Sequence, residues 1–134
     1  MNKEYPEVII DDVDVWCMQT IGVKHVEEIV LKLEHRVGSL KGRKCYGVLF
    51  GSPKDGLYRS CVSIKTEDDF KDLDRWVIPG GRYARTKIKD WENDIGIIGK
   101  TFSQMLKSCL TDDTRPSIEF YRSLKEVILL LPIR

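Results

Sequence analysis

A carboxylate and a phenol ring stand two residues apart in a short strand-like segment, Ser117-Ile118-Glu119-Phe120-Tyr121. Alternate residues of a strand share a face, so we expect Glu119 and Tyr121 to point the same way. Ile118 and Phe120 then occupy the opposite face, which we expect to lie under helices. A carboxylate beside an aromatic ring can hold a lipophilic cation by Coulomb and ring-quadrupole attraction. From residue statistics alone, an exposed strand glutamate paired with a lysine is the commoner arrangement.

Five further aromatic side chains could line such a site. Trp91 is the first choice, because it stands just before the second predicted helix and helix starts lie near the mouth of a cleft. The others fall in the first half of the chain and are Trp16, Tyr46, Phe50 and Tyr58. Taken one by one, such aromatic residues more often serve packing than binding.

Metal and cofactor chemistry has little support in the sequence. His25 and His35 both fall on the first predicted helix, about 80° and 15 Å apart, so they cannot share one metal ion. The cysteines at positions 17, 45, 61 and 109 show neither a zinc-ligand spacing nor a CxxC motif. We therefore expect no metal and no cofactor.

The composition indicates one ordinary globular domain. The 134 residues are 42% hydrophobic and 32% charged, with a formal net charge of +1. Such a weak field gives no reason to expect direct binding of nucleic acid or of an anionic membrane. The first six residues do not resemble a signal peptide, and the apolar run Val127–Leu131 is too short to span a bilayer. We expect a cytoplasmic protein with thiols rather than disulfides.

The elements that would position these residues occur twice. Residues 13–23 alternate like a strand, and an amphipathic helix with its apolar stripe from Val26 to Leu40 follows, ended by Gly38 and Gly42. Two more strands are expected at residues 45–50 and 57–65, joined by a turn rich in Gly and Pro.

The same order returns after residues 66–75, a mostly acidic stretch that we interpret as a solvated linker. Residues 76–88 read as a strand broken early by Pro79-Gly80-Gly81. A helix capped by Asn93 or Asp94 follows, and strands at residues 117–122 and 126–133 close the chain. The repeats would then cover about residues 10–65 and 76–134.

These patterns predict an α+β fold, in which duplicated βαββ repeats form one antiparallel sheet with both helices on one face and a pseudo-twofold cleft between the halves. The apolar run Val127–Leu131 does not alternate, so both faces of its strand should be covered. The cover could be the other half of the chain, a partner or a ligand.

Two motifs resemble those of the GyrI-like family. Pro79-Gly80-Gly81-Arg82-Tyr83-Ala84 resembles the family's PxGxYA signature, and residues 117–121 resemble a later strand that carries an E-x-Y pair. The resemblance covers almost the whole chain, and Gly47 of the first repeat aligns with the carboxylate position of the second. The connection at residues 122–125 is shorter than the family's loop.

The family includes effector-binding domains of multidrug-responsive regulators and stand-alone proteins of this length. The resemblance therefore implies a pocket between the repeats that holds a small organic ligand, with aromatic walls and Glu119 as its buried glutamate. It makes Glu119 a site residue, against the statistics, with Tyr121, Trp91, Tyr58, Tyr46 and Trp16 as candidate walls. It also suggests a regulator as protein partner, and it favours a binding module over an enzyme.

Two alternatives stay open. Some GyrI-like proteins hydrolyse strained cyclopropane rings in natural products, and Glu119 would then act as general base, with Glu92, Tyr58 or Tyr121 as possible helpers. The family name also suggests an interaction with DNA gyrase, for which the sequence offers no separate feature.

Overall fold

The computed structural model describes residues 5–94 and 96–134. Residues 1–4 lie outside the described residues, so the structure does not bear on the prediction about a signal peptide there. The described residues form strands, two α-helices and one short 3-10 helix. Their order is β1 (Glu7–Ile10), β2 (Val13–Ile21), α1 (Val26–Val37), β3 (Cys45–Phe50), β4 (Leu57–Ser63), β5 (Asp74–Ile78), β6 (Gly81–Lys89), η1 (Trp91–Asn93), α2 (Gly96–Ser108), β7 (Ser117–Tyr121) and β8 (Glu126–Pro132).

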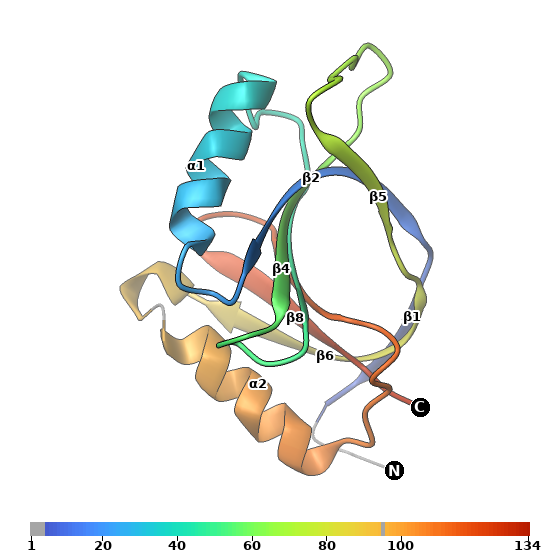
Figure 1. The fold of residues 1–134 in the computed structure, drawn as a ribbon. Helices are drawn as coiled ribbons and strands as arrows, with labels where there is room; N and C mark the ends of the chain where they lie inside the picture. The colour runs from blue at the N-terminus through green and yellow to red at the C-terminus, as the bar shows by residue number, and fades with distance from the viewer. Residues whose placement is uncertain (1–4, 95) are drawn as a thin grey trace.

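The described strands build one antiparallel sheet in the order β1-β6-β8-β7-β3-β4-β2-β5. The sheet curls into a half-barrel, and α1 and α2 lie on the same side of it (Figure 1). The predicted α+β class, the antiparallel sheet and the placement of both helices on one face are confirmed. No helix among the described residues is long and apolar enough to cross a membrane.

Each half of the chain carries one strand more than predicted. β1 precedes β2, and β5 precedes β6, so the observed unit is ββαββ. These extra strands pair across the halves: β1 pairs with β6, as in Val8↔Tyr83, and β5 pairs with β2, as in Val15↔Trp76. The prediction of one broken strand at residues 76–88 was therefore wrong, because the break at Pro79-Gly80 is a corner between strands with different partners.

The backbone repeats at the approach to each helix. Gly22 and Asp90 both adopt left-handed φ angles, of 69° and 55°. Each donates its N–H to the hairpin turn of its own half, Gly22 to the Gly56 carbonyl at 2.6 Å and Asp90 to the Lys125 carbonyl at 2.5 Å. The predicted duplication thus extends to single backbone hydrogen bonds.

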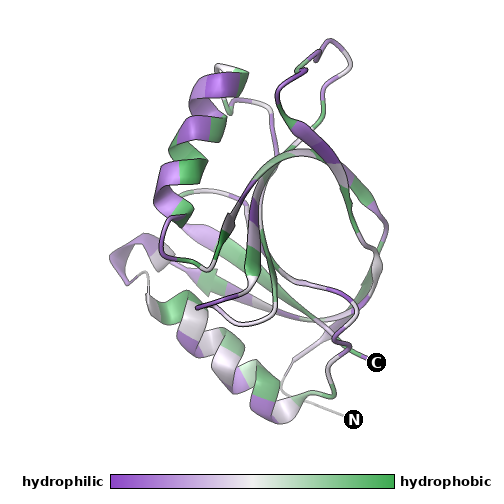
Figure 2. Cartoon of the chain, in the orientation of Figure 1, coloured by the Kyte–Doolittle hydropathy of each residue, from purple (hydrophilic) through white to green (hydrophobic). Residues whose placement is uncertain are grey.

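Both helices bury one stripe against the sheet. α1 buries Ile29 and Leu33, and α2 buries Ile98 and Met105. Apolar and hydrophilic colours accordingly alternate around both helices in Figure 2. α1 ends at Gly38, whose φ of 88° suits glycine and whose N–H bonds the Glu34 carbonyl at 3.0 Å.

Apolar side chains cover both faces of the sheet. On the helix face, Val127, Leu129 and Leu131 pack with α2, whereas Ile128 and Leu130 of the same strand join a cluster without helix residues. The protein itself therefore covers both faces of β8, as its unbroken apolar run predicted. Ile118 and Phe120 belong to the cluster on the face away from the helices, so the prediction that they lie under the helices was wrong.

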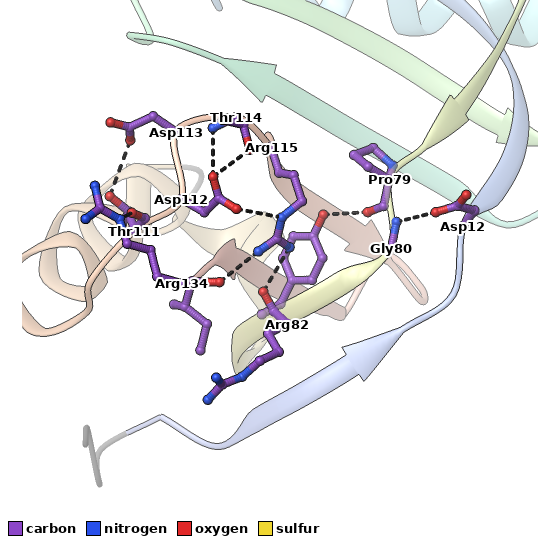
Figure 3. A network of polar contacts seen from close by, with 12 residues as sticks. Asp12, Pro79, Gly80, Arg82, Thr111, Asp112, Asp113, Thr114, Arg115 and Arg134 are labelled. Atoms are coloured by element: carbon purple, nitrogen blue, oxygen red, sulfur yellow. Dashed lines mark hydrogen bonds and ion pairs between the residues drawn. The ribbon is translucent and has the colours of Figure 1, made fainter.

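The residues of the Pro-Gly-Gly motif build the corner between β5 and β6 (Figure 3). Arg115 lies 4.8 Å from the ring centre of Tyr83 and donates to the carbonyls of Arg82 at 3.0 Å and Ile133 at 2.7 Å. A Cβ at Gly81 would approach this guanidinium to 2.8 Å, so glycine leaves room for it. Tyr83 is fully buried and donates its hydroxyl to the Pro79 carbonyl at 2.6 Å. The motif therefore serves the fold.

The prediction that the acidic stretch at residues 66–75 is a solvated linker was wrong, because part of it is buried. Asp68 accepts two hydrogen bonds from the Arg43 guanidinium, at 2.6 and 2.7 Å, and both side chains are at most 5% exposed. It also accepts the Trp16 indole N–H at 2.9 Å. Phe70 and Leu73 pack beside α1. A buried arginine and two apolar side chains hold this stretch against the first half.

Candidate functional site

Glu119 lies at the centre of the molecule, where the two halves share a sheet. β3 and β7 are the innermost strands, and in their register Glu119 stands directly opposite Gly47. Its neighbour on the same face, Tyr121, packs against the cluster that includes Ile98 and Met105 of α2. Glu119 therefore points to the helix face, on the pseudo-twofold line between the halves.

Two tyrosines from different halves donate to one oxygen of Glu119. The Tyr121 hydroxyl lies 2.6 Å from Oε1, and the Tyr58 hydroxyl of β4 lies 3.0 Å from the same atom. Gly47 makes this approach possible, because a Cβ at that position would overlap the Tyr58 hydroxyl and Glu119 Oε1. We call Gly47, Tyr58, Trp91, Glu119 and Tyr121 the Glu119 cluster.

Burial raises the pKa of Glu119 above its ordinary value, although the tyrosine hydrogen bonds oppose that shift. No lysine or arginine contributes to the pKa of Glu119, so among the described residues nothing basic offsets its charge. Burial and the neighbouring carboxylate in turn raise the pKa values of Tyr58 and Tyr121, which stay protonated as donors. The cluster is thus an acid held by neutral donors only.

Trp91 completes the aromatic side of the cluster. It begins the 3-10 helix that follows Asp90, and its ring meets that of Tyr121 edge-on, with centroids 5.1 Å apart. The indole N–H donates to the Ser123 carbonyl at 3.1 Å. The short connection between β7 and β8 therefore fixes the indole that lies beside Tyr121.

The helices leave the innermost strands comparatively open. α1 packs mainly on β2 and β4, and α2 packs mainly on β8. Glu119, Tyr121 and Trp91 each keep part of their surface accessible to solvent, although protein atoms enclose the Glu119 carboxyl closely enough to shift its pKa.

The structure does not bring every candidate aromatic residue to Glu119. Trp16 lies under α1, where it bonds Asp68 and meets Phe70 edge-on at 5.5 Å. Tyr46 stacks on Phe120 at 5.0 Å, and Phe50 packs near Trp76, both on the face away from the helices. Trp16, Tyr46 and Phe50 therefore have packing roles here and are not adjacent to Glu119.

Gly47 is the member of the cluster whose role the sequence did not reveal. Its alignment with the position of Glu119 was visible, but not the need for a missing side chain. A glycine inside a strand often marks a close approach, and that signal could have been used. Among the described residues, no group of three histidine, cysteine or acidic side chains could hold a metal ion.

No protein-family model and no curated protein sequence matches the chain. Its fold is similar to that of the integron cassette protein VCH_CASS2 of Vibrio cholerae, with 12% identity over 96% of this chain and 95% of that one and a TM-score of 0.71. It is also similar to the EcmrR C-terminal domain, with 12% identity over 97% and 98% and a TM-score of 0.67.

A third similar structure is SAV2435 bound to tetraphenylphosphonium, with 10% identity over 97% and 93% of the two chains and a TM-score of 0.65. A hydrolase from Listeria innocua has the fold as well, with 13% identity over 96% and 90% and a TM-score of 0.59. Identities this low establish the similarity of fold alone.

Proposed function

We propose that the protein binds a lipophilic organic cation over the Glu119 cluster, as a stand-alone module of the effector-binding type. Glu119 supplies the negative charge, and Tyr121, Trp91 and Tyr58 supply aromatic surface. The observation that carries the proposal is the carboxyl itself. It lies at the middle of the sheet, enclosed enough to raise its pKa, partly accessible and without a basic partner among the described residues.

A buried anion without a countercharge is costly, and a bound cation would lower that cost. The aromatic rings add attraction for a cation over their faces. SAV2435, which shares the fold, was solved with an organic cation, and EcmrR uses such a domain at its C-terminus. The first of these facts supports a cation as the ligand, and we keep a regulator as the candidate protein partner.

The test is a titration with tetraphenylphosphonium and with a lipophilic cationic dye, followed by melting temperature and by tryptophan fluorescence. We expect Glu119→Gln to weaken binding about tenfold or more, because the charge is lost while the shape is kept. Glu34→Gln is the matched control, since Glu34 is exposed on α1 and its loss should leave binding unchanged. Equal affinity in wild type and Glu119→Gln would remove Glu119 from the site.

Hydrolysis is the second candidate function, and the raised pKa of Glu119 is the observation that favours it. A carboxyl with a raised pKa is a better general base, and a Listeria innocua hydrolase shares the fold. Turnover of a cyclopropane-containing alkylating compound, abolished in Glu119→Gln, would support this activity. Modulation of DNA gyrase stays a prediction, which a supercoiling assay with the pure protein would test.

A further inference from the structure

The two oxygens of Glu119 are not equivalent. Oε1 accepts both tyrosine hydrogen bonds, at 2.6 Å from Tyr121 and 3.0 Å from Tyr58. A carboxylate oxygen has two lone-pair directions, so Oε1 has no further place for a donor. Oε2 accepts no hydrogen bond from the described part of the chain. Among the described residues, Arg43 Nε is the one fully buried polar side-chain atom without a hydrogen-bond partner, so Oε2, which has no partner either, keeps part of its surface exposed to solvent.

This asymmetry restricts what a ligand can do at the carboxyl. A guanidinium or amidinium normally binds a carboxylate with two parallel N–H donors, one to each oxygen. Here the tyrosines already occupy Oε1, so such a fork would have to displace one of them. A single N–H donor needs only Oε2 and leaves both tyrosine hydrogen bonds intact.

We infer that the site selects organic cations whose charged nitrogen carries a hydrogen, that is, aryl-alkyl ammonium ions that donate one hydrogen bond to Glu119 Oε2. This inference rests on the proposed function and narrows the chemical class of its ligand. Permanently charged ions without an N–H keep only the Coulomb and ring attraction. Amidinium ions lose one of their two donors or displace a tyrosine.

The rings of the Glu119 cluster fit the rest of such a ligand. Trp91 and Tyr121 meet edge-on with centroids 5.1 Å apart and both remain partly accessible, so an aryl group can pack beside them. The ammonium would then sit at Oε2 with its carbon substituents toward these rings, where cation–ring attraction adds to the hydrogen bond.

The experiment compares three ligands that share a naphthylethyl group and differ in the charged end. They are the protonated dimethylamine, its trimethylammonium form and the corresponding amidinium, each titrated by calorimetry at pH 7. Because a hydrogen bond to an ionised group is a strong one, we expect the dimethylammonium ion to bind about tenfold more tightly than the trimethylammonium ion. The amidinium should also bind more weakly than the dimethylammonium ion.

Two variants separate the inference from the proposed function. In Glu119→Gln, affinity for all three cations should fall and the preference for the N–H donor should shrink. In Tyr121→Phe, one lone pair of Oε1 becomes free, so the amidinium should gain affinity relative to the dimethylammonium ion. A purely structural role of Tyr121 would weaken all three ligands alike, which would count against the inference.

If the trimethylammonium ion binds as tightly as the dimethylammonium ion, and both depend on Glu119, the proposed function stands and the inference is overturned. If none of the three cations binds the wild-type protein but tetraphenylphosphonium does, the inference is overturned and the proposed function stands; if tetraphenylphosphonium does not bind either, both are overturned. A tenfold preference that is lost in Glu119→Gln supports both.

Discussion

Each half of the chain places one residue at the midpoint of the sheet, Gly47 in the first half and Glu119 in the second. The halves also differ at the residue that approaches each helix, where the first half has an aliphatic side chain and the second an aromatic one. Val23 follows the left-handed residue Gly22, whereas Trp91 follows the left-handed residue Asp90. The backbone is nearly duplicated, but the second half supplies the carboxyl and the indole. At this symmetric junction, the missing side chain of Gly47 makes room for the Glu119 carboxyl and the Tyr58 hydroxyl.

The halves also differ in the carboxylate that a corresponding arginine binds. Arg43 and Arg115 each stand two residues before the third strand of their own half. Each donates to a carbonyl at the end of the last strand of that half, Ser63 at the end of β4 and Ile133 directly after β8. Arg43 reaches a carboxylate in the connecting stretch, Asp68, with two hydrogen bonds. Arg115 instead bonds Asp112 in the preceding loop, with one hydrogen bond at 3.2 Å. The first half thus depends on residues outside its own βαββ unit.

The midpoint gives the largest expected effect. Gly47→Ala inserts a Cβ where the Tyr58 hydroxyl and Glu119 Oε1 lie, so we expect a loss of about 1 to 3 kcal/mol in the free energy of unfolding and a loss of cation affinity. Urea denaturation and dye titration measure the two. Gly99→Ala is the control: nothing lies within 4 Å of its Cβ position in α2, so it should stabilise the fold by up to about 1 kcal/mol. Wild-type behaviour of Gly47→Ala would show that the midpoint has spare room.

The arginine contacts give the next effect. Asp68→Asn leaves the Arg43 guanidinium without its carboxylate, and we expect the free energy of unfolding to fall by about 2 kcal/mol. Asp112→Asn should have a smaller effect, since the side chain is 27% exposed and Arg115 keeps two carbonyl partners. Equal losses in the two variants would contradict the contrast between the halves.

The midpoint carboxyl should also make stability depend on pH. Burial raises the pKa of Glu119 in the folded chain, so the folded state holds this proton more tightly than the unfolded state. Stability should therefore fall as pH rises from the unfolded pKa, about 4.3, through the raised folded pKa, and should then level off. Glu119→Gln should remove this decline, which urea denaturation at a series of pH values would show. A variant that keeps the same slope would assign the decline to other groups.

The smallest effect is expected at Asp90, the residue before the 3-10 helix. Asp90 adopts a left-handed φ of 55°, so Asp90→Gly should stabilise the fold by at most about 1 kcal/mol. Gly22→Asp, the reverse exchange, should destabilise it clearly, because a Cβ there would overlap the Lys54 carbonyl. Thermal melts of the two variants measure the difference. If the two exchanges changed the melting temperature by equal amounts in opposite directions, Gly22 and Asp90 would tolerate a side chain equally well, contrary to their contacts.

Much of this architecture could be predicted from local patterns. Apolar periodicity located both helices and most strands to within a few residues, since an amphipathic stripe reports directly on burial. The pairing partners of β1 and β5 were not visible, because four or five residues carry no information about which distant strand they join. The alternation in residues 117–121 correctly put Glu119 and Tyr121 on one face. It could not tell which face the helices cover, because the curled sheet buries Ile118 as fully as a helix would.

The candidate site, like the fold, could be predicted where it depends on local spacing and not where it depends on strand pairing. Glu119 and Tyr121 were linked by spacing, and Trp91 by its place before a helix. The contribution of Tyr58 depends on β3 lying between β4 and β7, which is a property of the whole sheet. Trp16 and Tyr46 show the opposite case, since an aromatic residue on a strand gives no sign of which neighbour it will pack against.

The exchange of outer strands between the halves has a mechanical consequence. Because β1 adds to the second half and β5 to the first, neither half can swing away from the other without tearing main-chain hydrogen bonds at both margins of the sheet. Under the proposed function, we expect ligands of different size to be accommodated by rotation of side chains over a rigid sheet. We also expect the whole chain to melt in a single cooperative step.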